Sequence, residues 1–115
     1  MEPTLFHIID TSMWTNAQLQ THYSPASVAA EGFIHLSLRS QILRPANLLY
    51  HGRTDLHLLV IDAARLDAEV VMEPGSHGET ALFPHLYGEL NLDSIDRVVT
   101  FPCNDDGTFL LPAEL

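Results

Sequence analysis

Histidine is the residue type that offers this sequence the most chemistry. The 115 residues include seven histidines, and imidazole is the side chain whose unperturbed pKa lies nearest neutrality, which suits it to proton transfer, metal binding and polar recognition. His7, His35 and His85 lie within or at the start of apolar segments that predict strands. An imidazole on a half-buried strand needs a partner, because burying a polar group unpaired costs about 1–3 kcal/mol. If the three rings converge, they can satisfy one another or a ligand, and we take them as the candidate catalytic residues.

Two other interpretations of these three histidines stay open. Each ring can instead be a separate core residue bonded to the backbone. Three histidines and a water also form the ligand set of a catalytic zinc ion, but the sequence has neither the His-x-His nor the His-Glu-x-x-His spacing, and we expect no metal. The other histidines are interpreted as surface or loop residues; they are His22, His51, His57 and His77.

Charged residues near the three histidines in sequence are further candidates. Glu31 and Glu73 can each orient an imidazole or accept a hydrogen bond from a ribose hydroxyl. Glu73 is the better candidate, because it ends a buried-looking strand beside the long loop at 74–80. Arg39 follows a predicted strand and can meet an anionic ligand, although a surface ion pair is the commoner state of such a residue. Cys103 has no basic residue near it in sequence to activate a thiolate and precedes an acidic turn, so we interpret it as structural.

The elements that must position these residues are short strands and helices. Strands are expected at 4–9, 33–37, 56–61, 69–72, 86–90, 97–101 and 108–111, the last two forming a hairpin around a turn at 104–107, and helices at 11–20, 27–30 and 40–50. Thr11 or Ser12 is the expected N-cap of the first helix, and Gly32 ends the second. Pro45 either kinks the third helix or begins a new one. This order indicates one α+β domain over residues 1–115.

Composition and charge exclude several classes of function. The chain has 15 acidic residues against five arginines and no lysine, a formal net charge of −10. Such a chain repels the phosphates of duplex nucleic acid and the surface of an anionic membrane. No apolar run is long enough to span a bilayer, and the first residues do not resemble a signal peptide. With one cysteine as well, we expect a cytoplasmic protein.

Two segments of the sequence resemble the signature segments of the family of unknown function 952, DUF952. They are EGFIHLS at 31–37 and FPHLYG at 83–88. Other positions fit the same family pattern, namely 6–8, Trp14, Tyr23, Pro25, 58–62 and Glu73. The likeness covers nearly the whole chain, and the two long segments are specific in combination. The family name supplies no reaction.

That family in turn looks like a compact version of the ADP-ribosyltransferase fold, which includes the tRNA 2′-phosphotransferases. This similarity implies a mostly antiparallel split sheet with two or three helices. The positions that match the superfamily's first strand, second strand and late catalytic residue are His7, His35 after Gly32, and His85. The sequence departs from the superfamily in having His7-Ile8-Ile9 in place of His-Gly-Thr, and a histidine where toxins have a catalytic glutamate.

The resemblance implies roles for these residues. His7 would hold a ribose hydroxyl of NAD or a related nucleotide, His35 would line the nicotinamide or phosphate side, and His85 would act as general acid or base. Further ligand-binding residues are expected at Gly32, Phe33, Ser37, Arg39, Glu73 and Tyr87. Because histidine lacks the negative charge of the toxins' glutamate, the resemblance favours a nucleotide-processing or phosphotransferase-like reaction with a small-molecule nucleotide. The alternatives are a non-catalytic nucleotide-binding module and a zinc-dependent hydrolase.

Overall fold

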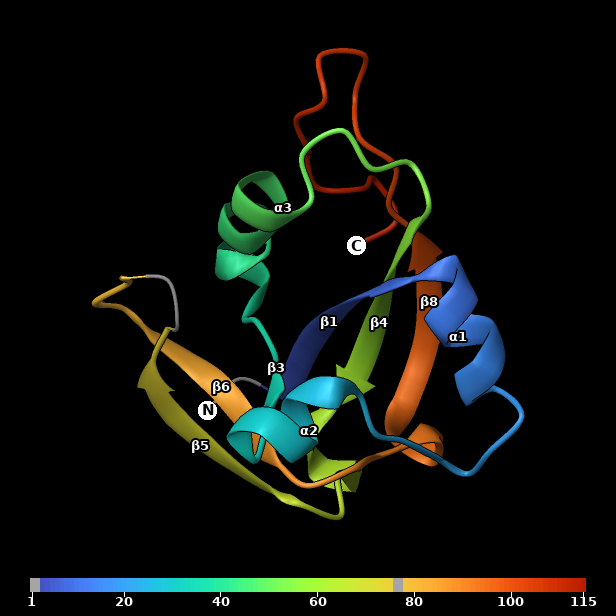
Figure 1. Ribbon diagram of the computed structural model, residues 1–115, viewed down its shortest axis with the longest axis vertical. Helices are drawn as coiled ribbons and strands as arrows, with labels where there is room; N and C mark the ends of the chain where they lie inside the picture. The colour runs from blue at the N-terminus through green and yellow to red at the C-terminus, as the bar shows by residue number, and fades with distance from the viewer. Residues whose placement is uncertain (1–2, 76–77) are drawn as a thin grey trace.

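The fold combines short antiparallel sheets with three α-helices in the computed structural model, which describes residues 3–75 and 78–115 (Figure 1). The helices are α1 (Thr11–Ala17), α2 (Ala26–Glu31) and α3 (Leu43–Leu49). The strands are β1 (Thr4–Asp10), β2 (His22–Tyr23), β3 (Ile34–His35), β4 (Leu56–Asp62), β5 (Glu69–Pro74), β6 (Leu82–Tyr87), β7 (Leu90–Asn91) and β8 (Ile95–Thr100). The 3₁₀ turns are η1 (Arg39–Gln41), η2 (Ala63–Arg65) and η3 (Leu92–Ser94). The predicted α+β class, with antiparallel sheets and up to three helices, is confirmed.

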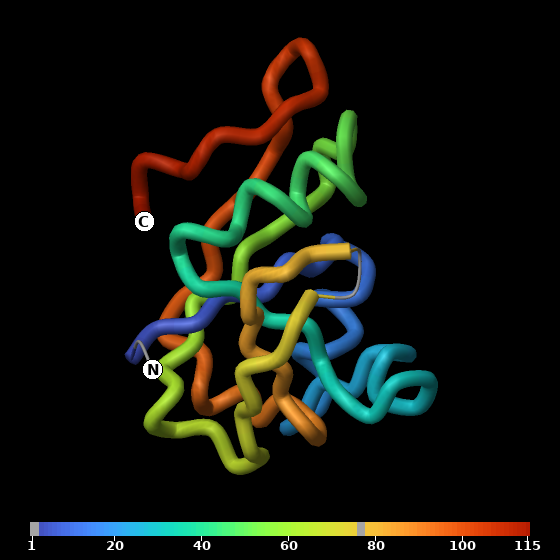
Figure 2. Tube along the Cα trace, turned by 90° about the vertical axis from the view of Figure 1, so that its left-hand side faces the viewer, coloured from blue at the N-terminus to red at the C-terminus, as the bar shows by residue number. Residues whose placement is uncertain are grey.

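Two three-stranded sheets meet at β1. One sheet has the order β1-β4-β8 and the other β3-β6-β5, while β2 and β7 form a separate pair; every strand pair is antiparallel. The two larger sheets are joined where Phe6 pairs with Ser37, just beyond β3, through hydrogen bonds of 2.9 and 2.8 Å. This junction brings the His7 segment beside the His35 segment, although they are far apart in sequence (Figure 2).

The alternation of side chains along β1 decides which way His7 faces. Leu5 and Ile9 are buried in one hydrophobic cluster together with Leu59 of β4, whereas Phe6 is buried in a second cluster on the other face of the sheet. Because side chains alternate with a period of two along a strand, His7 points to the same face as Leu5 and Ile9. The central strand β4 contributes to both clusters, as its apolar sequence, interrupted only by His57, predicts.

The helix ends follow local capping rules, with one correction to the expected cap. The N-cap of α1 is Asp10, whose Oδ1 accepts a hydrogen bond of 2.8 Å from the Met13 amide, so the prediction of Thr11 or Ser12 was wrong. As predicted, α2 ends at Gly32, whose φ of 89° is in the left-handed region. Pro45 lies in the first turn of α3, where its missing N–H is not needed. None of the helices in the described residues has the length and apolar character of a membrane span.

Two strand predictions were wrong. The strand expected at 86–90 is β6, which covers Leu82–Tyr87. It starts earlier because Pro84 is accommodated inside it, and the Pro84 carbonyl accepts a hydrogen bond from the Leu36 amide. Residues 108–111 form no strand, although the turn at 104–107 is present. The Phe109 amide donates instead to the Asn47 side chain, and the Phe109 ring packs against Phe101 at 4.8 Å. This segment is therefore held by α3 and the core and does not pair with β8.

Candidate functional site

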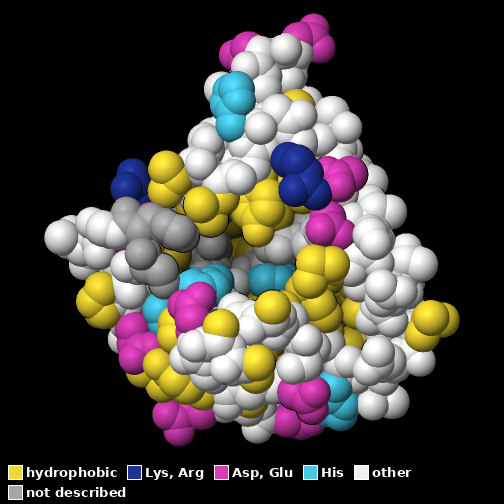
Figure 3. All heavy atoms as spheres, viewed as in Figure 1, with side chains coloured by type: hydrophobic (Ala, Val, Ile, Leu, Met, Phe, Trp, Pro, Cys, Tyr) yellow, Lys and Arg dark blue, Asp and Glu magenta, His cyan; other side chains and the backbone are white. Residues whose placement is uncertain are grey.

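The three candidate histidines line one pocket of about 320 Å³. The pocket lies where α2, α3, β1, β3 and β6 approach one another, so its lining comes from segments across most of the sequence. In the space-filling view, histidine side chains lie at the bottom of a hollow whose walls carry many hydrophobic side chains (Figure 3). The structure thus brings His7, His35 and His85 together, which sequence alone could not show.

His7 is held in a single tautomer by the backbone of β3. Its Nδ1 donates a hydrogen bond of 2.8 Å to the carbonyl oxygen of His35, so the lone pair of the neutral ring is on Nε2. Burial lowers the pKa of His7 to about 4, with a smaller opposing effect from the His35 carbonyl. The ring is therefore neutral at neutral pH, and it offers the pocket a hydrogen-bond acceptor.

His85 is oriented by a carboxylate on the neighbouring strand. Its residue is only 2% exposed, and its Nδ1 donates to Oε1 of Glu73 at 2.9 Å. Tyr87 donates its hydroxyl to the same oxygen at 2.6 Å. The hydrogen bonds from Tyr87 and His85 lower the pKa of Glu73, and the bond to Glu73 raises the pKa of Tyr87. Glu73 is thus an ionised carboxylate at neutral pH, and its hydrogen bond fixes the orientation of the imidazole.

The second ring nitrogen of His85 has no partner. Within residues 3–75 and 78–115, His85 Nε2 is the one buried side-chain nitrogen or oxygen atom without a hydrogen bond. The ring is covered on one side by Phe33, which stacks on it with a centroid distance of 4.1 Å and an interplanar angle of 12°. Buried polar atoms are nearly always paired, so an unpaired one calls for an explanation. A ligand group in the pocket that the ring lines is such an explanation.

His35 lies opposite His85 in the antiparallel register of β3 and β6, with 5.4 Å between the ring centroids. Its Nε2 is 3.3 Å from Oε1 of Glu31, one helical turn earlier in sequence. Both carboxylates suggested by the sequence therefore contact an imidazole, Glu31 that of His35 and Glu73 that of His85. The ring of His35 is more exposed, at 41% of its side chain, and lies at the edge of the cluster.

The walls of the pocket are mainly apolar, and the charged residues among them are carboxylates. Apolar lining comes from Met13 of α1, Pro25, Ala26, Pro45 and Leu49. Asp10 and Glu79 also line the pocket, whereas no arginine does among the described residues. Sequence reasoning missed both acids. Asp10 could have been found from its position as the residue before a helix, but nothing in the loop around Glu79 indicates that its side chain turns inward.

The other predicted ligand-binding residues divide into four groups. Ser37 lines the pocket directly. Phe33, Glu73 and Tyr87 contact or support His85 from behind the lining. Gly32 gives the chain the left-handed turn between α2 and the segment of Phe33. Arg39 is not at this pocket; it lines a separate groove on the other face of β1, beside Arg97.

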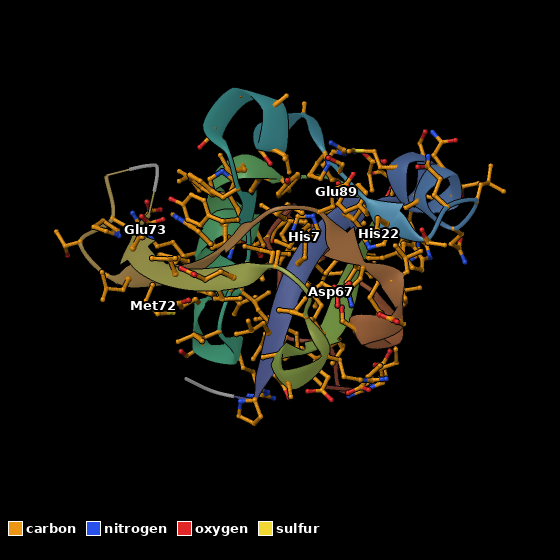
Figure 4. All side chains as sticks on the ribbon, turned by 90° about the horizontal axis from the view of Figure 1, so that it is seen from below. His7, His22, Asp67, Met72, Glu73 and Glu89 are labelled. Carbon is orange, nitrogen blue, oxygen red and sulfur yellow. The ribbon has the colours of Figure 1, made fainter. Side chains whose placement is uncertain are left out.

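The remaining histidines in the described part of the chain lie outside the pocket lining. His22 is near Asp67, with 3.7 Å between Nε2 and Oδ2, and both lie apart from Glu73 (Figure 4). His57 contacts the hydroxyl of Thr11, and His51 is exposed, whereas His77 lies outside the described residues. Among residues 3–75 and 78–115, no three or more His, Cys, Asp or Glu side chains are grouped so that they could hold a metal ion.

Comparison with known proteins decides the family. Residues 8–98 match the protein family of unknown function DUF952. The chain belongs to this family. The matched region of this DUF952 protein contains His35, Glu73 and His85 and begins one residue after His7.

Solved structures support the same relationship. The fold is similar to the crystal structure of protein CC0527 from Caulobacter crescentus, a structural genomics target, with 30% identity, a TM-score of 0.82 and 94% of each chain covered. The solution NMR structure of CC0527 is also 30% identical, with a TM-score of 0.82 over 99% of this chain and 97% of that one. No functionally curated protein matches the sequence.

Proposed function

We propose that this DUF952 protein is an enzyme that acts on NAD or a related nucleotide by histidine acid–base catalysis, in the manner of an ADP-ribosyltransferase-like transferase. The observation that carries the proposal is His85, which is buried, held by the Glu73 carboxylate, unpartnered at Nε2 and part of a pocket lining that also includes His7 and His35. Retaining a buried imidazole with one unpaired nitrogen lowers stability, and such costs are typical of functional sites.

His85 suits the role of general base or acid. In the neutral ring, Nδ1 donates to Glu73, and the lone pair on Nε2 can take a proton from an attacking hydroxyl. The hydroxyl oxygen would bond to the anomeric carbon of the ribose as the bond from that carbon to nicotinamide breaks. Nicotinamide leaves as a neutral base, so the imidazolium, still hydrogen-bonded to the Glu73 carboxylate, would release its proton to water. Tyr87 contributes a second hydrogen bond that keeps Glu73 ionised and in place.

His7 suits the role of a fixed acceptor. Its Nδ1 is committed to the His35 carbonyl, and its low pKa keeps the ring neutral, so Nε2 can accept a hydrogen bond from a ribose hydroxyl. His35 is partly exposed and edge-on to Phe33, with the ring centroids 4.9 Å apart, and would contact the base or leaving group. In this proposal the reacting sugar lies over the histidines, as the likeness to the ADP-ribosyltransferase fold implies. The antiparallel split sheet supports that likeness.

The experiment is a thermal-shift titration with NAD, ADP-ribose and 2′-phosphorylated nucleotides, followed by chromatography of the reaction products. A ligand at 100 times its dissociation constant adds about 2.7 kcal/mol to stability, which such a titration detects readily. We expect the wild-type protein and the His22→Ala variant to be stabilised and to give product. His22→Ala is the matched control, because this histidine is partly exposed, as His35 is, but does not line the pocket.

The His85→Leu variant should lose both the product and the ligand-induced shift. Binding that requires His85 but gives no product would favour a nucleotide-binding module. If His85→Leu behaves as His22→Ala does, the proposed function is wrong.

A further inference from the structure

Two tyrosines line the pocket beside the histidines. Tyr23 comes from β2 and Tyr50 from the C-terminal end of α3. The ring of Tyr23 lies next to that of His7, with 5.6 Å between the ring centroids. Tyr50 and Asp10 are both near enough to Tyr23 to raise its pKa. The two tyrosines therefore extend the polar part of the lining from His7 toward α3.

Neither of these hydroxyls has a partner in the protein. Within residues 3–75 and 78–115, no hydrogen bond joins the hydroxyl of Tyr23 or of Tyr50 to another group. The third tyrosine, Tyr87, differs, because its hydroxyl donates to Glu73. Tyrosine hydroxyls on buried rings usually find a partner. Two that line a pocket without one are suited to a ligand.

Both hydroxyls are donors on rings that the core holds in place. Tyr23 is 7% exposed and belongs to the hydrophobic cluster of Leu5, while Tyr50 packs against the cluster of Phe6. Burial raises the pKa of Tyr23 to about 12 and is also the main cause that raises the pKa of Tyr50, so both keep their protons at neutral pH. A phenol can accept as well, but a ligand that only donates to it leaves the phenolic proton unsatisfied.

The two carboxylates of the lining are already engaged within the protein. Asp10 accepts from the Met13 amide through Oδ1, and its Oδ2 is 3.8 Å from Arg53. Glu79 is paired with Arg44, with 3.3 Å between Oε1 and Nε. Neither acid therefore requires a donor from the ligand.

The remaining polar groups leave a simple pattern. Ser27 and Ser37 line the pocket with small hydroxyls that can turn to donate or to accept, so they favour no class of ligand. His7 and His85 each present the Nε2 lone pair of a ring whose Nδ1 is already bonded. The pocket thus offers acceptors at the histidines and donors at the two tyrosines. A ligand that satisfies both carries hydroxyl groups at one end and an acceptor atom at the other.

We infer that Tyr23 and Tyr50 bind the base of the substrate by donating hydrogen bonds to its carbonyl oxygen, so that the pocket selects bases with a carbonyl group. The inference rests on the proposed function, in which His7 holds a ribose hydroxyl, and it names the class of substrate. A base attached to that ribose is within reach of Tyr23, because the rings of His7 and Tyr23 are in contact. A carbonyl oxygen has two lone pairs and can accept from both tyrosines.

The test compares two ligands that differ in the carbonyl group alone. They are the N-ribosides of meta-acetylpyridine and meta-ethylpyridine, which share the ribose and a cationic ring, while a CH₂ group replaces the carbonyl in the second. Dissociation constants are measured with the full chain by isothermal titration calorimetry. We expect the wild-type protein to bind the acetyl compound about tenfold or more tightly, a difference of about 1.4 kcal/mol, because the ethyl compound leaves the tyrosine donors unpaired.

The variants remove hydroxyl groups and keep the rings. In Tyr23→Phe/Tyr50→Phe the two ribosides should bind within about threefold of each other, since the donors are gone. This double variant should keep the wild-type unfolding midpoint in urea, because neither hydroxyl has a partner in the described part of the chain. Tyr87→Phe is the matched control: its hydroxyl is outside the pocket lining, so the preference for the acetyl compound should persist even if both affinities change.

The outcomes separate this inference from the proposed function. Equal binding of the two ribosides by the wild-type protein, or binding of NAD without either riboside, would overturn the inference and leave the proposed function standing. A preference that persists in the double variant, or that is lost equally in Tyr87→Phe, would overturn the roles of Tyr23 and Tyr50. No binding of either riboside, together with no response to NAD, would overturn both.

Discussion

Replacing His85 with leucine should separate the stability of the protein from its function. Leucine is close to histidine in volume, favours burial and has no polar side-chain atom. The substitution removes the unpartnered Nε2, and an unsatisfied buried polar group costs about 1–3 kcal/mol. It also removes the stacked contact with Phe33 at 4.1 Å, and such aromatic pairs contribute about 0.5–1.5 kcal/mol. The hydrogen bond to Glu73 is lost as well, but this carboxylate is partly exposed, and water can take the place of the imidazole.

Removing the unsatisfied nitrogen gains more free energy than losing the stacked contact with Phe33 costs, so we predict that the variant is about 1 kcal/mol more stable than the wild type. For a domain of this size, that corresponds to a rise of roughly 4 °C in Tm. The free energy of unfolding is measured by urea denaturation followed by circular dichroism, and Tm by calorimetry. Ligand response and product formation should be lost in the same variant. The combination of equal or greater stability with lost function is what an imidazole kept for chemistry predicts.

The result that would refute this reasoning is a loss of about 2 kcal/mol or more in the His85→Leu variant. Such a loss would mean that the imidazole contributes more to folding than its hydrogen bond and stacking explain. His85 would then be a structural core residue bonded within the protein, which is the interpretation that the sequence left open.

Three other predictions concern single residues around the pocket. Burial lowers the pKa of His7 from 6.5 to about 4, so between these pH values the unfolded chain binds more protons than the folded protein. The contribution of neutral His7 to the free energy of unfolding is therefore complete above about pH 6.5. It falls by at most about 3 kcal/mol as the pH drops to 4. The His7→Asn variant can still donate to the His35 carbonyl but has no titrating ring, so it should lose this part of the pH dependence. In the wild-type protein, an NMR titration that gives the His7 ring a pKa near 6.5 would contradict the prediction. Asp10→Ala should lower the free energy of unfolding, measured by urea denaturation, by about 1 kcal/mol. Asp10→Asn should lower it much less, because asparagine can also cap α1. Equal losses in the two variants would argue against the cap. Gly32→Ala should lower the free energy of unfolding by about 1–2 kcal/mol through its φ of 89° alone, since no atom beyond its two chain neighbours lies within 4 Å of the added methyl group. An unchanged unfolding midpoint would show that the turn relaxes.

The sequence predicted β1, β4 and the end of α2 well because their signals are local. The apolar runs of β1 and β4 and the stop at Gly32 depend on residues within a few positions of each other. The hairpin at the C-terminus failed because its outcome is decided by a distant group, the Asn47 side chain that accepts from the Phe109 amide. The N-cap of α1 failed because Asp10 serves both as the last residue of β1 and as the cap of the helix that follows.

The site was predictable in its histidines and less so in its surroundings. The three rings were identified because an imidazole within apolar sequence is unusual, and Glu73 because it ends a strand. Their convergence depends on the pairing of Phe6 with Ser37, which no local pattern encodes. The inward position of Glu79 likewise depends on its contact with Arg44, 35 residues earlier. Arg39 was placed at the site on sequence proximity alone, and the turn after β3 directs it to the other face.

The central claim is that Nε2 of His85 meets the ligand of this pocket. Long-range proton–nitrogen NMR spectra of the histidine rings, recorded during titration with NAD and with nicotinamide riboside, test it directly. We predict a saturable change in the Nε2 resonance of His85, with little change in the rings of His22 and His57, which lie outside the pocket lining. Saturable binding that leaves the His85 ring unchanged, or the absence of any binding, would contradict the claim.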